Sequence, residues 1–403
     1  MHILLVHQAF AALDEAGGTR HHELARFLVK RGHQVTIIAS PVSYLTGKEN
    51  GQKQNRIPEP GITILRAYTY TALHRSFIHR VISFLSFMLS SFFLGLSVRK
   101  VDLVWGTSPP IFQGITAWLL ARLKRTPFLF EVRDLWPAFA IAVGILRNKL
   151  LISSSLWLES FLYRQADCVM VNSPGYIDHV RRRGARRVEL VQNGADPEMF
   201  NPAVDGLSFR CDHNLQDKFI VLYAGAHGMS NDLGVVLQAA DLLRDEADIR
   251  LVLIGDGKEK PALQAMAKAM NLSNLIFIPP AVKDEMPAVL AAADACIAIL
   301  KPIELYKTTY PNKVFDYMAA GRPIVLAIDG VIRHVVESAG AGIFVQPGNP
   351  QDMARAIQAL ALAPQKARQM GLAGRSYVEE HFSRAESAEK LALLVEKMGR
   401  KNG

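Results

Sequence analysis

The sequence is poor in cysteine, which limits the kinds of protein it can be. Its 403 residues contain three cysteines, Cys168, Cys211 and Cys296, at wide separations. They allow neither a disulfide framework nor the paired spacing of a zinc site, so we expect a reducing compartment and no metal. The opening residues, MHILLVHQ, run straight into a strand-like stretch without a charged leader or cleavage site, which favours a cytoplasmic protein.

Several motifs of nucleotide enzymes and nucleic-acid binders are also missing. No G-x-G-x-x-G follows a predicted strand, which argues against a dehydrogenase. The tetrapeptide DEAD at 245–248 lies at a predicted helix end without a phosphate loop, so a helicase is excluded. There is no zinc pattern, RNA-binding aromatic signature or helix-turn-helix spacing.

Acidic residues are scarce in the first half of the chain. Residues 1–200 carry 24 Lys and Arg against 14 Asp and Glu, whereas the remaining 203 carry 22 against 23. Nucleic acid and an anionic membrane surface could each explain this excess, and the missing nucleic-acid motifs favour the membrane. One basic cluster, at 181–187, is either a solvated helix end or a second lipid contact.

Apolar runs rich in Val, Ile and Leu alternate with amphipathic helical stretches along the whole chain. Such runs indicate strands covered on both faces, as in doubly wound parallel sheets. The first series is HILLVH, QVTIIAS, VDLVWG, PFLFEV and DCVMVN. The second series is FIVLYAG, RLVLIGDG, LIFIPP, ACIAIL, PIVLAI and GIFVQP.

The alternation breaks once, at 196–218, where Asn, Pro, Gly and Asp cluster. We expect the connection between two domains there. Two similar α/β domains suggest a ligand in a cleft outside the carboxyl ends of both sheets.

The stretch 76–98 requires a separate interpretation. Residues 81–98 include no charge, which reaches the lower limit for a membrane span. Ser83, Ser86, Ser90 and Ser97 recur at helical spacing, however, and make one side mildly polar. The stretch also lies between two predicted strands, where a crossover helix is required. We therefore expect a buried or half-buried crossover helix. The alternatives are a helix dipping into the membrane surface beside the basic residues Arg75, Arg80, Arg99 and Lys100, and a true membrane span.

Glycines follow the first strand of each predicted domain. Gly17 and Gly18 precede a helix in the first, where a backbone can approach an anionic ligand; the alternative is a plain loop with a helix cap. In the second, Gly225, His227 and Gly228 outline a phosphate site before a helix that we expect from about residue 231.

The next glycine-rich strand end, RLVLIGDGKE, holds Lys258 close by. Two glycine-rich strand ends in one domain indicate a nucleotide. In the segment 310–323, YPNKVFDYMAAGRP, Lys313 and Asp316 are three residues apart on one helix face. The lysine can neutralise a pyrophosphate and the carboxylate can accept both hydroxyls of a ribose; the alternative is a surface ion pair.

The chain resembles family 4 glycosyltransferases of the GT-B fold, and it looks closest to bacterial O-antigen, capsule and exopolysaccharide enzymes of the N-acetyl-L-fucosaminyltransferase type. The resemblance covers nearly the whole length. The matching segments are GGTRHHELARFLVKRGHQVTII, VRDLWP, VQNGADPEMF, YPNKVFDYMAAGRPIV and the tail GLAGRSYVEEHFS.

The resemblance implies two Rossmann-like domains facing across a cleft. Residues 1–200 would bind the acceptor and face the membrane, residues 201–382 would bind the donor, and residues 383–403 would form a helix returning to the first domain. Gly17 and Gly18 would face the donor pyrophosphate or sugar. Asp134 would lie beside the reacting sugar, so Asp134 and Gly18 are the catalytic candidates.

In the second domain, the resemblance places the phosphates along Gly225, His227 and Gly228. The backbone near Ala281 and Val282 would hold the base. No cofactor is implied, because the nucleotide-sugar is itself the co-substrate.

The sequence departs from the family pattern at several points, including Ala138, which stands where close relatives often carry a glutamate after DLWP. Asp316 takes the place of the second glutamate of the family's Glu-x7-Glu motif, and Thr308 replaces the first. The family's diphosphate-gripping Arg and Lys are not at their usual positions after the first glycine turn, so Lys258, Lys307 or Lys313 is a candidate substitute.

The resemblance implies a retaining, metal-independent transfer from a nucleotide-sugar, with UDP as the expected nucleotide. We expect front-side displacement, because no carboxylate pair suits a double displacement. The expected acceptor is a glycan linked to polyprenyl pyrophosphate at the inner face of the cytoplasmic membrane, and no nucleic acid is involved. The alternatives are an inactive donor-binding scaffold and a nucleotide-sugar 2-epimerase of related fold.

Overall fold

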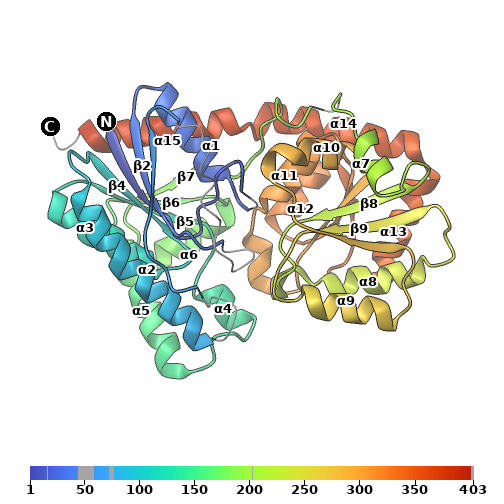
Figure 1. Ribbon diagram of the computed structural model, residues 1–403, viewed down its shortest axis with the longest axis horizontal. Coiled ribbons are helices and arrows are strands. Elements are labelled where there is room, and N and C mark those ends of the chain that lie inside the picture. Colours follow the sequence, from blue (N-terminus) through green and yellow to red (C-terminus); the bar gives the residue numbers. More distant parts are fainter. Residues whose placement is uncertain (16, 44–58, 72–76, 202, 401–403) are drawn as a thin grey trace. The chain divides into compact units, whose positions relative to one another are not determined.

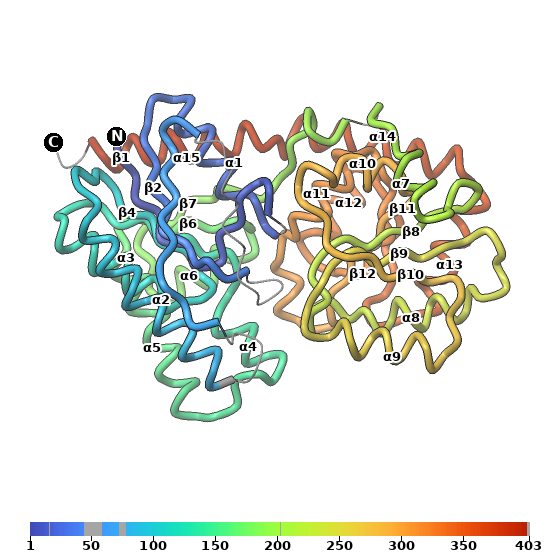
Figure 2. The backbone as a smooth tube through the Cα atoms, viewed as in Figure 1, coloured from blue at the N-terminus to red at the C-terminus, as the bar shows by residue number. Residues whose placement is uncertain are grey.

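The computed structural model describes residues 1–15, 17–43, 59–71, 77–201 and 203–400. It divides into two compact units (Figures 1 and 2). The first is Met1–Gln192 with the C-terminal helix from Ala385, and the second is Asn193–Arg384. The segment 196–218, where we expected the connection, belongs to the second unit and carries α7 (Leu207–Asp212).

The first unit is built on a parallel sheet. Its strands within the described residues are β1 (His2–Val6), β2 (Gln34–Ala39), β3 (Ile62–Arg66), β4 (Leu103–Ser108), β5 (Phe128–Val132), β6 (Cys168–Val171) and β7 (Val188–Leu190). Their order is β3-β2-β1-β4-β5-β6-β7, so the direction of winding reverses between β1 and β4. Open sheets of this kind bind ligands at the carboxyl ends of the strands at such a reversal.

Helices cover both faces of this sheet (Figure 1). They are α1 (Arg20–Lys30), α2 (Phe77–Ser97), α3 (Phe112–Lys124), α4 (Ala138–Ala142), α5 (Lys149–Gln165), α6 (Ile177–Arg182) and α15 (Arg384–Gly399), with a 3-10 turn at Pro174–Tyr176. On one face, apolar side chains of the strands pack against α1 and α15. On the other, a Cβ at Gly106 of β4 would lie 2.6 Å from the Cβ of Ala117 in α3, so the helix sits directly on the strand.

The last helix, α15, completes the core of the first unit, as predicted. Leu391 and Val395 are fully buried in the same cluster as Leu24 of α1. Arg31, at the end of α1, pairs with Glu389 at 2.7 Å and with a second glutamate on α15. Figure 2 shows α15 beside α1.

The second unit repeats the architecture with its own parallel sheet. Its strands within the described residues are β8 (Phe219–Ala224), β9 (Ile249–Ile254), β10 (Leu275–Ile278), β11 (Ala295–Ile299), β12 (Ile324–Ala327) and β13 (Gly342–Phe344). Their order is β10-β9-β8-β11-β12-β13, with the reversal between β8 and β11. The predicted doubly wound parallel sheets are therefore confirmed.

Helices again cover both faces. They are α7, α8 (Leu233–Leu242), α9 (Lys260–Ala269), α10 (Met286–Ala291), α11 (Asn312–Ala319), α12 (Val331–Ser338), α13 (Pro350–Leu362) and α14 (Pro364–His381), with 3-10 turns η2 (Met229–Asn231), η3 (Lys283–Glu285) and η4 (Glu304–Thr308). Helices α8, α9 and α13 pack on one face, and α10, α11, α12 and α14 on the other. The helix expected from residue 231 begins later, at Leu233, because Asp232 adopts a left-handed conformation with φ of 45°.

Helix α2 is the predicted crossover between β3 and β4, but its polar side faces inward. The Ser90 hydroxyl donates to the carbonyl of Tyr68 at 2.6 Å, and the Ser86 hydroxyl accepts from the N–H of Tyr70 at 2.9 Å. The opposite side exposes large apolar side chains: Ile78, Ile82, Leu85, Leu89, Phe93 and Leu96. Within the described part of the chain, α2 is the one helix long and apolar enough to span a membrane, and 28% of its apolar window is buried.

Candidate functional site

The carboxyl end of β8 provides a glycine turn beside the start of α11. Gly225 has φ of 148°, a conformation that favours glycine. A Cβ there would lie 2.7 Å from Nζ of Lys313. A Cβ at Gly255, at the end of neighbouring β9, would collide with the carbonyl oxygen of Gly225. The two predicted glycine-rich strand ends therefore meet, and the absence of a side chain at Gly225 lets Lys313 lie close to the turn.

Lys313 brings an amine into this turn. Its Nζ is buried, lies 3.8 Å from the centroid of the Tyr223 ring, and has no hydrogen-bond partner among the described residues. Burial lowers the pKa of Lys313 to about 7. An unpaired buried amine is costly, so an anion that reaches Nζ gains a strong charge-assisted hydrogen bond.

His227 occupies the middle of the turn. Its backbone N–H donates to the carbonyl of Asp256 at 2.8 Å, and its carbonyl accepts from Glu259 at 2.9 Å, which ties the β8 loop to the β9 loop. The ring is fully buried, and within the described chain neither ring nitrogen has a partner. Burial, with the charges of Lys260 and Lys313, lowers the pKa of His227 to about 4, so the ring is neutral at pH 7.

The structure places Lys260, rather than Lys258, against the turn. Lys260 donates from Nζ to the carbonyl of Gly255 at 2.7 Å, whereas Lys258 is exposed. We had not singled out Lys260. A signal was available, because Lys260 is the first residue of α9, and a cation at a helix N-terminus opposes the helix dipole unless another interaction compensates.

Asp316 pairs with a lysine that the sequence analysis missed. Its Oδ2 lies 3.1 Å from Nζ of Lys283, which also sits 4.5 Å from the centroid of the Phe200 ring. Asp316 and Lys313 both lie on α11, but this ion pair runs to the β10 loop. Lys283 directly follows Val282, whose N–H donates to the Glu285 carboxylate at 3.2 Å.

Two other residues that we predicted to bind the nucleotide-sugar donor, Thr308 and Gly228, have contrasting surroundings. The hydroxyl of Thr308 donates to the carbonyl of Leu305 at 2.6 Å inside η4, so it stabilises the turn. Gly228 has an extended backbone, and a Cβ there would meet no atom closer than 3.8 Å. Space therefore remains beside the Gly228 backbone.

In the first unit, the predicted glycines lie on the loop between β1 and α1. Both are exposed. A Cβ at Gly17 would lie 2.9 Å from the Cβ of Ala11, whereas one at Gly18 would meet nothing within 4 Å. This loop follows β1, one of the two strands between which the direction of winding reverses.

Asp134 follows β5 in the same unit and is half-buried. Burial raises the pKa of Asp134 to about 6, although the neighbouring charge of Arg133 acts in the opposite direction. The carboxyl group therefore titrates close to neutral pH.

A buried polar cluster at the start of α1 was not anticipated. Glu131 of β5 accepts from Arg20, from His21 at 2.6 Å and from the Trp105 indole at 3.2 Å. Burial alone would raise the pKa of Glu131, but His21 and Arg20 lower it to about 2. The carboxylate is therefore ionised and fixes the start of α1 against the sheet. A glutamate inside the apolar run PFLFEV was the available signal.

Both halves of the chain match known protein families. Residues 16–194 match the family described as "Glycosyl transferase 4-like domain", and residues 218–362 match "Glycosyl transferases group 1". The chain is a glycosyltransferase of family 4 type. Over 359 residues, 85% of its length, it is 26% identical to a protein of Escherichia coli K12 named as the colanic acid biosynthesis glycosyl transferase WcaI, of which it covers 88%.

Solved structures show that the glycosyltransferase has the GT-B fold. A sucrose-phosphate synthase from Thermosynechococcus elongatus superposes with a TM-score of 0.78 at 19% identity, covering 98% of both chains. Anabaena HepE, in complex with UDP and glucose, superposes with a TM-score of 0.74 at 15% identity, covering 98% of this chain and all of that one. Within its described residues, the glycosyltransferase holds no group of three or more His, Cys, Asp and Glu residues suited to a metal.

Proposed function

We propose that this glycosyltransferase moves a hexosamine-type or other sugar, with retention, from a UDP-sugar to a glycan linked to polyprenyl pyrophosphate in bacterial surface polysaccharide synthesis. The N-acetyl-L-fucosaminyltransferase type remains our expectation for the sugar. WcaI, which is named for colanic acid biosynthesis, supports the assignment to surface polysaccharide.

The observation that carries the proposal is the buried amine of Lys313 at the glycine turn. Its Nζ has no partner among the described residues and lies against the backbone of Gly225, in the same turn as the open space beside Gly228. A diphosphate at this turn would pair with Lys313, and Lys260 would add positive potential. The HepE structure with UDP supports a uridine nucleotide for this fold.

The chemistry follows from charge development on the leaving group. As the bond from the anomeric carbon to the diphosphate breaks, negative charge grows on the phosphate oxygens, and Lys313 would stabilise it. A phosphate oxygen would accept the proton of the attacking hydroxyl on the same face, which retains the configuration without a metal. Gly18 and Asp134 are our candidates for positioning the reacting sugar.

The outward apolar side of α2 supports a membrane-bound acceptor. Six large apolar side chains form one exposed stripe, and the basic excess of residues 1–200 suits anionic lipids. Arg80 lies in the first turn of the helix and Arg99 and Lys100 follow its end, whereas Arg75 and Ser76 lie outside the described residues. We therefore propose peripheral association with the inner face of the cytoplasmic membrane.

An assay with UDP-sugars and a lipid-linked acceptor tests the transfer. We expect UDP release that requires the acceptor, and a large loss of kcat/KM in Lys313→Met. The exposed Lys258→Met serves as the matched control and should keep most of the activity. Interconversion of the sugar without acceptor would instead show an epimerase, and donor binding without either reaction would show a scaffold.

A further inference from the structure

The second unit has a cavity at the opposite edge of its sheet. The cavity measures about 370 Å³. Phe219 begins β8, Asp294 precedes β11 and Pro323 precedes β12, so the cavity lies at the amino ends of the strands. The glycine turn around Lys313 lies at the carboxyl ends, so the two places are separated by the length of the strands.

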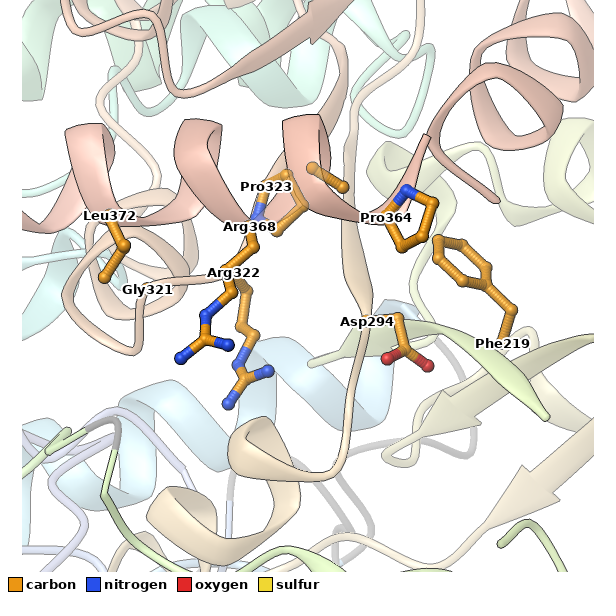
Figure 3. A pocket seen from close by; sticks show the side chains of 9 residues that line it. Phe219, Asp294, Gly321, Arg322, Pro323, Pro364, Arg368 and Leu372 are labelled. Carbon is orange, nitrogen blue, oxygen red and sulfur yellow. The ribbon is translucent and has the colours of Figure 1, made fainter. Parts of the chain in front are cut away.

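Two arginines line the cavity, and within the described part of the chain neither forms an ion pair with an acidic side chain. Figure 3 shows the guanidinium groups of Arg322 and Arg368 side by side. Arg322 donates from Nη1 to the carbonyl of Ala293 at 2.9 Å, but its buried Nε has no partner within the described residues. Arg368 is exposed on α14. Like charges repel, so two adjacent guanidinium groups favour an anion between them.

Asp294, the acidic residue that lines the cavity, already has two hydrogen-bond partners. Oδ2 of Asp294 accepts from Arg210 at 2.8 Å and from the N–H of Ile220 at 2.7 Å. This network fixes the start of β8 and neutralises the carboxylate. In Figure 3, Asp294 lies apart from the two guanidinium groups, on the side of Phe219.

Helix α14 adds positive potential to the same wall. The helix has 18 residues and begins at Pro364, which lines the cavity. The amino end of a helix carries partial positive charge and favours anions. Burial lowers the pKa of Arg322; the charges of Arg210 and Arg368 act in the same direction, whereas that of Asp294 acts in the opposite one.

We propose that this cavity is a second anion site, which binds the phosphate group of a small molecule. Arg322 and Arg368 hold the phosphate, and the less polar part of the ligand lies against Phe219, Pro323 and Pro364. Bidentate guanidinium contacts suit phosphate oxygens. The site is distinct from the donor site and does not depend on the transfer reaction.

Calorimetric titration at constant ionic strength tests the proposal, with inorganic phosphate and glucose 6-phosphate as probes. Because phosphate could also reach the donor site, the titrations are made on the Lys313→Met variant. We expect binding of both probes if phosphate alone suffices, or of glucose 6-phosphate only if the sugar contributes, and of neither glucose nor chloride.

Loss of one guanidinium should weaken binding about tenfold or more, the effect of one charge-assisted hydrogen bond. We expect this for Arg368→Ala and for Arg322→Gln, which keeps a donor for the Ala293 carbonyl. Arg355→Ala, at an exposed arginine on α13, is the matched control and should bind normally. Absence of binding, or equal affinity in Arg368→Ala and Arg355→Ala, would overturn the proposal.

Discussion

Lys313 illustrates how a single side chain can be kept ready for a ligand. Its neighbours are an aromatic ring and glycine backbone, and neither solvates an ammonium group as water does. The free protein therefore holds the amine near its titration point, with a pKa of about 7. A diphosphate at this position would restore the ordinary preference for the charged form.

This arrangement predicts a pH dependence of donor affinity. Below pH 7 the amine of the free protein is charged, and above pH 7 binding must take up a proton, so affinity falls as pH rises. Between pH 6 and pH 8 we expect a loss of about tenfold for a UDP-sugar, whose diphosphate does not titrate in this range. His227, with a pKa of about 4, stays neutral throughout.

Calorimetry at several pH values, in buffers of different ionisation enthalpy, measures both the affinity and the proton uptake. The variant Lys313→Met should bind more weakly and show no such slope. Equal affinity of the wild-type protein at pH 6 and pH 8, without proton uptake, would contradict the assignment.

The sequence was sufficient to name Lys313 and the glycine turns as candidates, because these residues follow strand ends in a recognisable order, and their role in donor binding stays a prediction. It was not sufficient to find Lys283 as the partner of Asp316, or to choose Lys260 over Lys258. Those contacts depend on β9 lying next to β8 and on β10 lying next to β9 in the sheet, and strand order is not encoded in local spacing.

For helix α2 as well, the sequence predicted one feature and missed another. Its position between β3 and β4 followed from the apolar run and the rule that parallel strands need a crossover. The sequence did not predict which side of α2 is buried. Tyr68 and Tyr70, after β3, present backbone groups that need partners, and the serines of α2 supply them. The more apolar side is therefore left outside.

The exposed stripe of α2 predicts binding to anionic vesicles. A charge placed in the stripe, Phe93→Glu, should abolish most of this binding, because a buried carboxylate opposes insertion and repels anionic lipid. The helix should remain folded, since Phe93 is 67% exposed. Flotation with vesicles containing anionic lipid measures the effect.

The matched control is Leu362→Glu, at an 86% exposed leucine of α13 in the second unit. It should float as the wild-type protein does. Equal flotation of Phe93→Glu and Leu362→Glu, or no flotation of the wild-type protein at low salt, would refute the membrane assignment.

At the scale of the whole molecule, the chain builds most of the first unit, then the second, and returns to complete the first. The alternation of strands and helices predicted both sheets. The exact crossings, after Gln192 and after Arg384, are not marked by composition, because the segment 196–218 is irregular yet packs with the second unit.

This connectivity predicts that a cavity in α15 destabilises the first unit. Leu391 is fully buried against α1, so Leu391→Ala should lower the free energy of unfolding by about 2–5 kcal/mol. Leu393→Ala, at a half-exposed position on the same helix, should change it by less than about 0.5 kcal/mol.

Tryptophan fluorescence during denaturant unfolding is suited to this measurement. The tryptophans of the sequence all lie in the first unit: Trp105, Trp118, Trp136 and Trp157. If both variants unfolded at the same denaturant concentration as the wild-type protein, α15 would not contribute to the core of the first unit.

Because α15 packs on the first unit, its late synthesis affects the folding of the nascent chain. During translation, β1 and α1 are made before the second unit, but α15, the other helix that covers this face of the sheet, is made only after the entire second unit. At about 5–20 residues per second, synthesis of the second unit, Asn193–Arg384, takes on the order of 10–40 s. Throughout this interval the apolar residues that later meet Leu391 and Val395 lack their partner. The first unit is thus the last to complete its core. Until then, the apolar face that α15 later covers is exposed and can bind a chaperone.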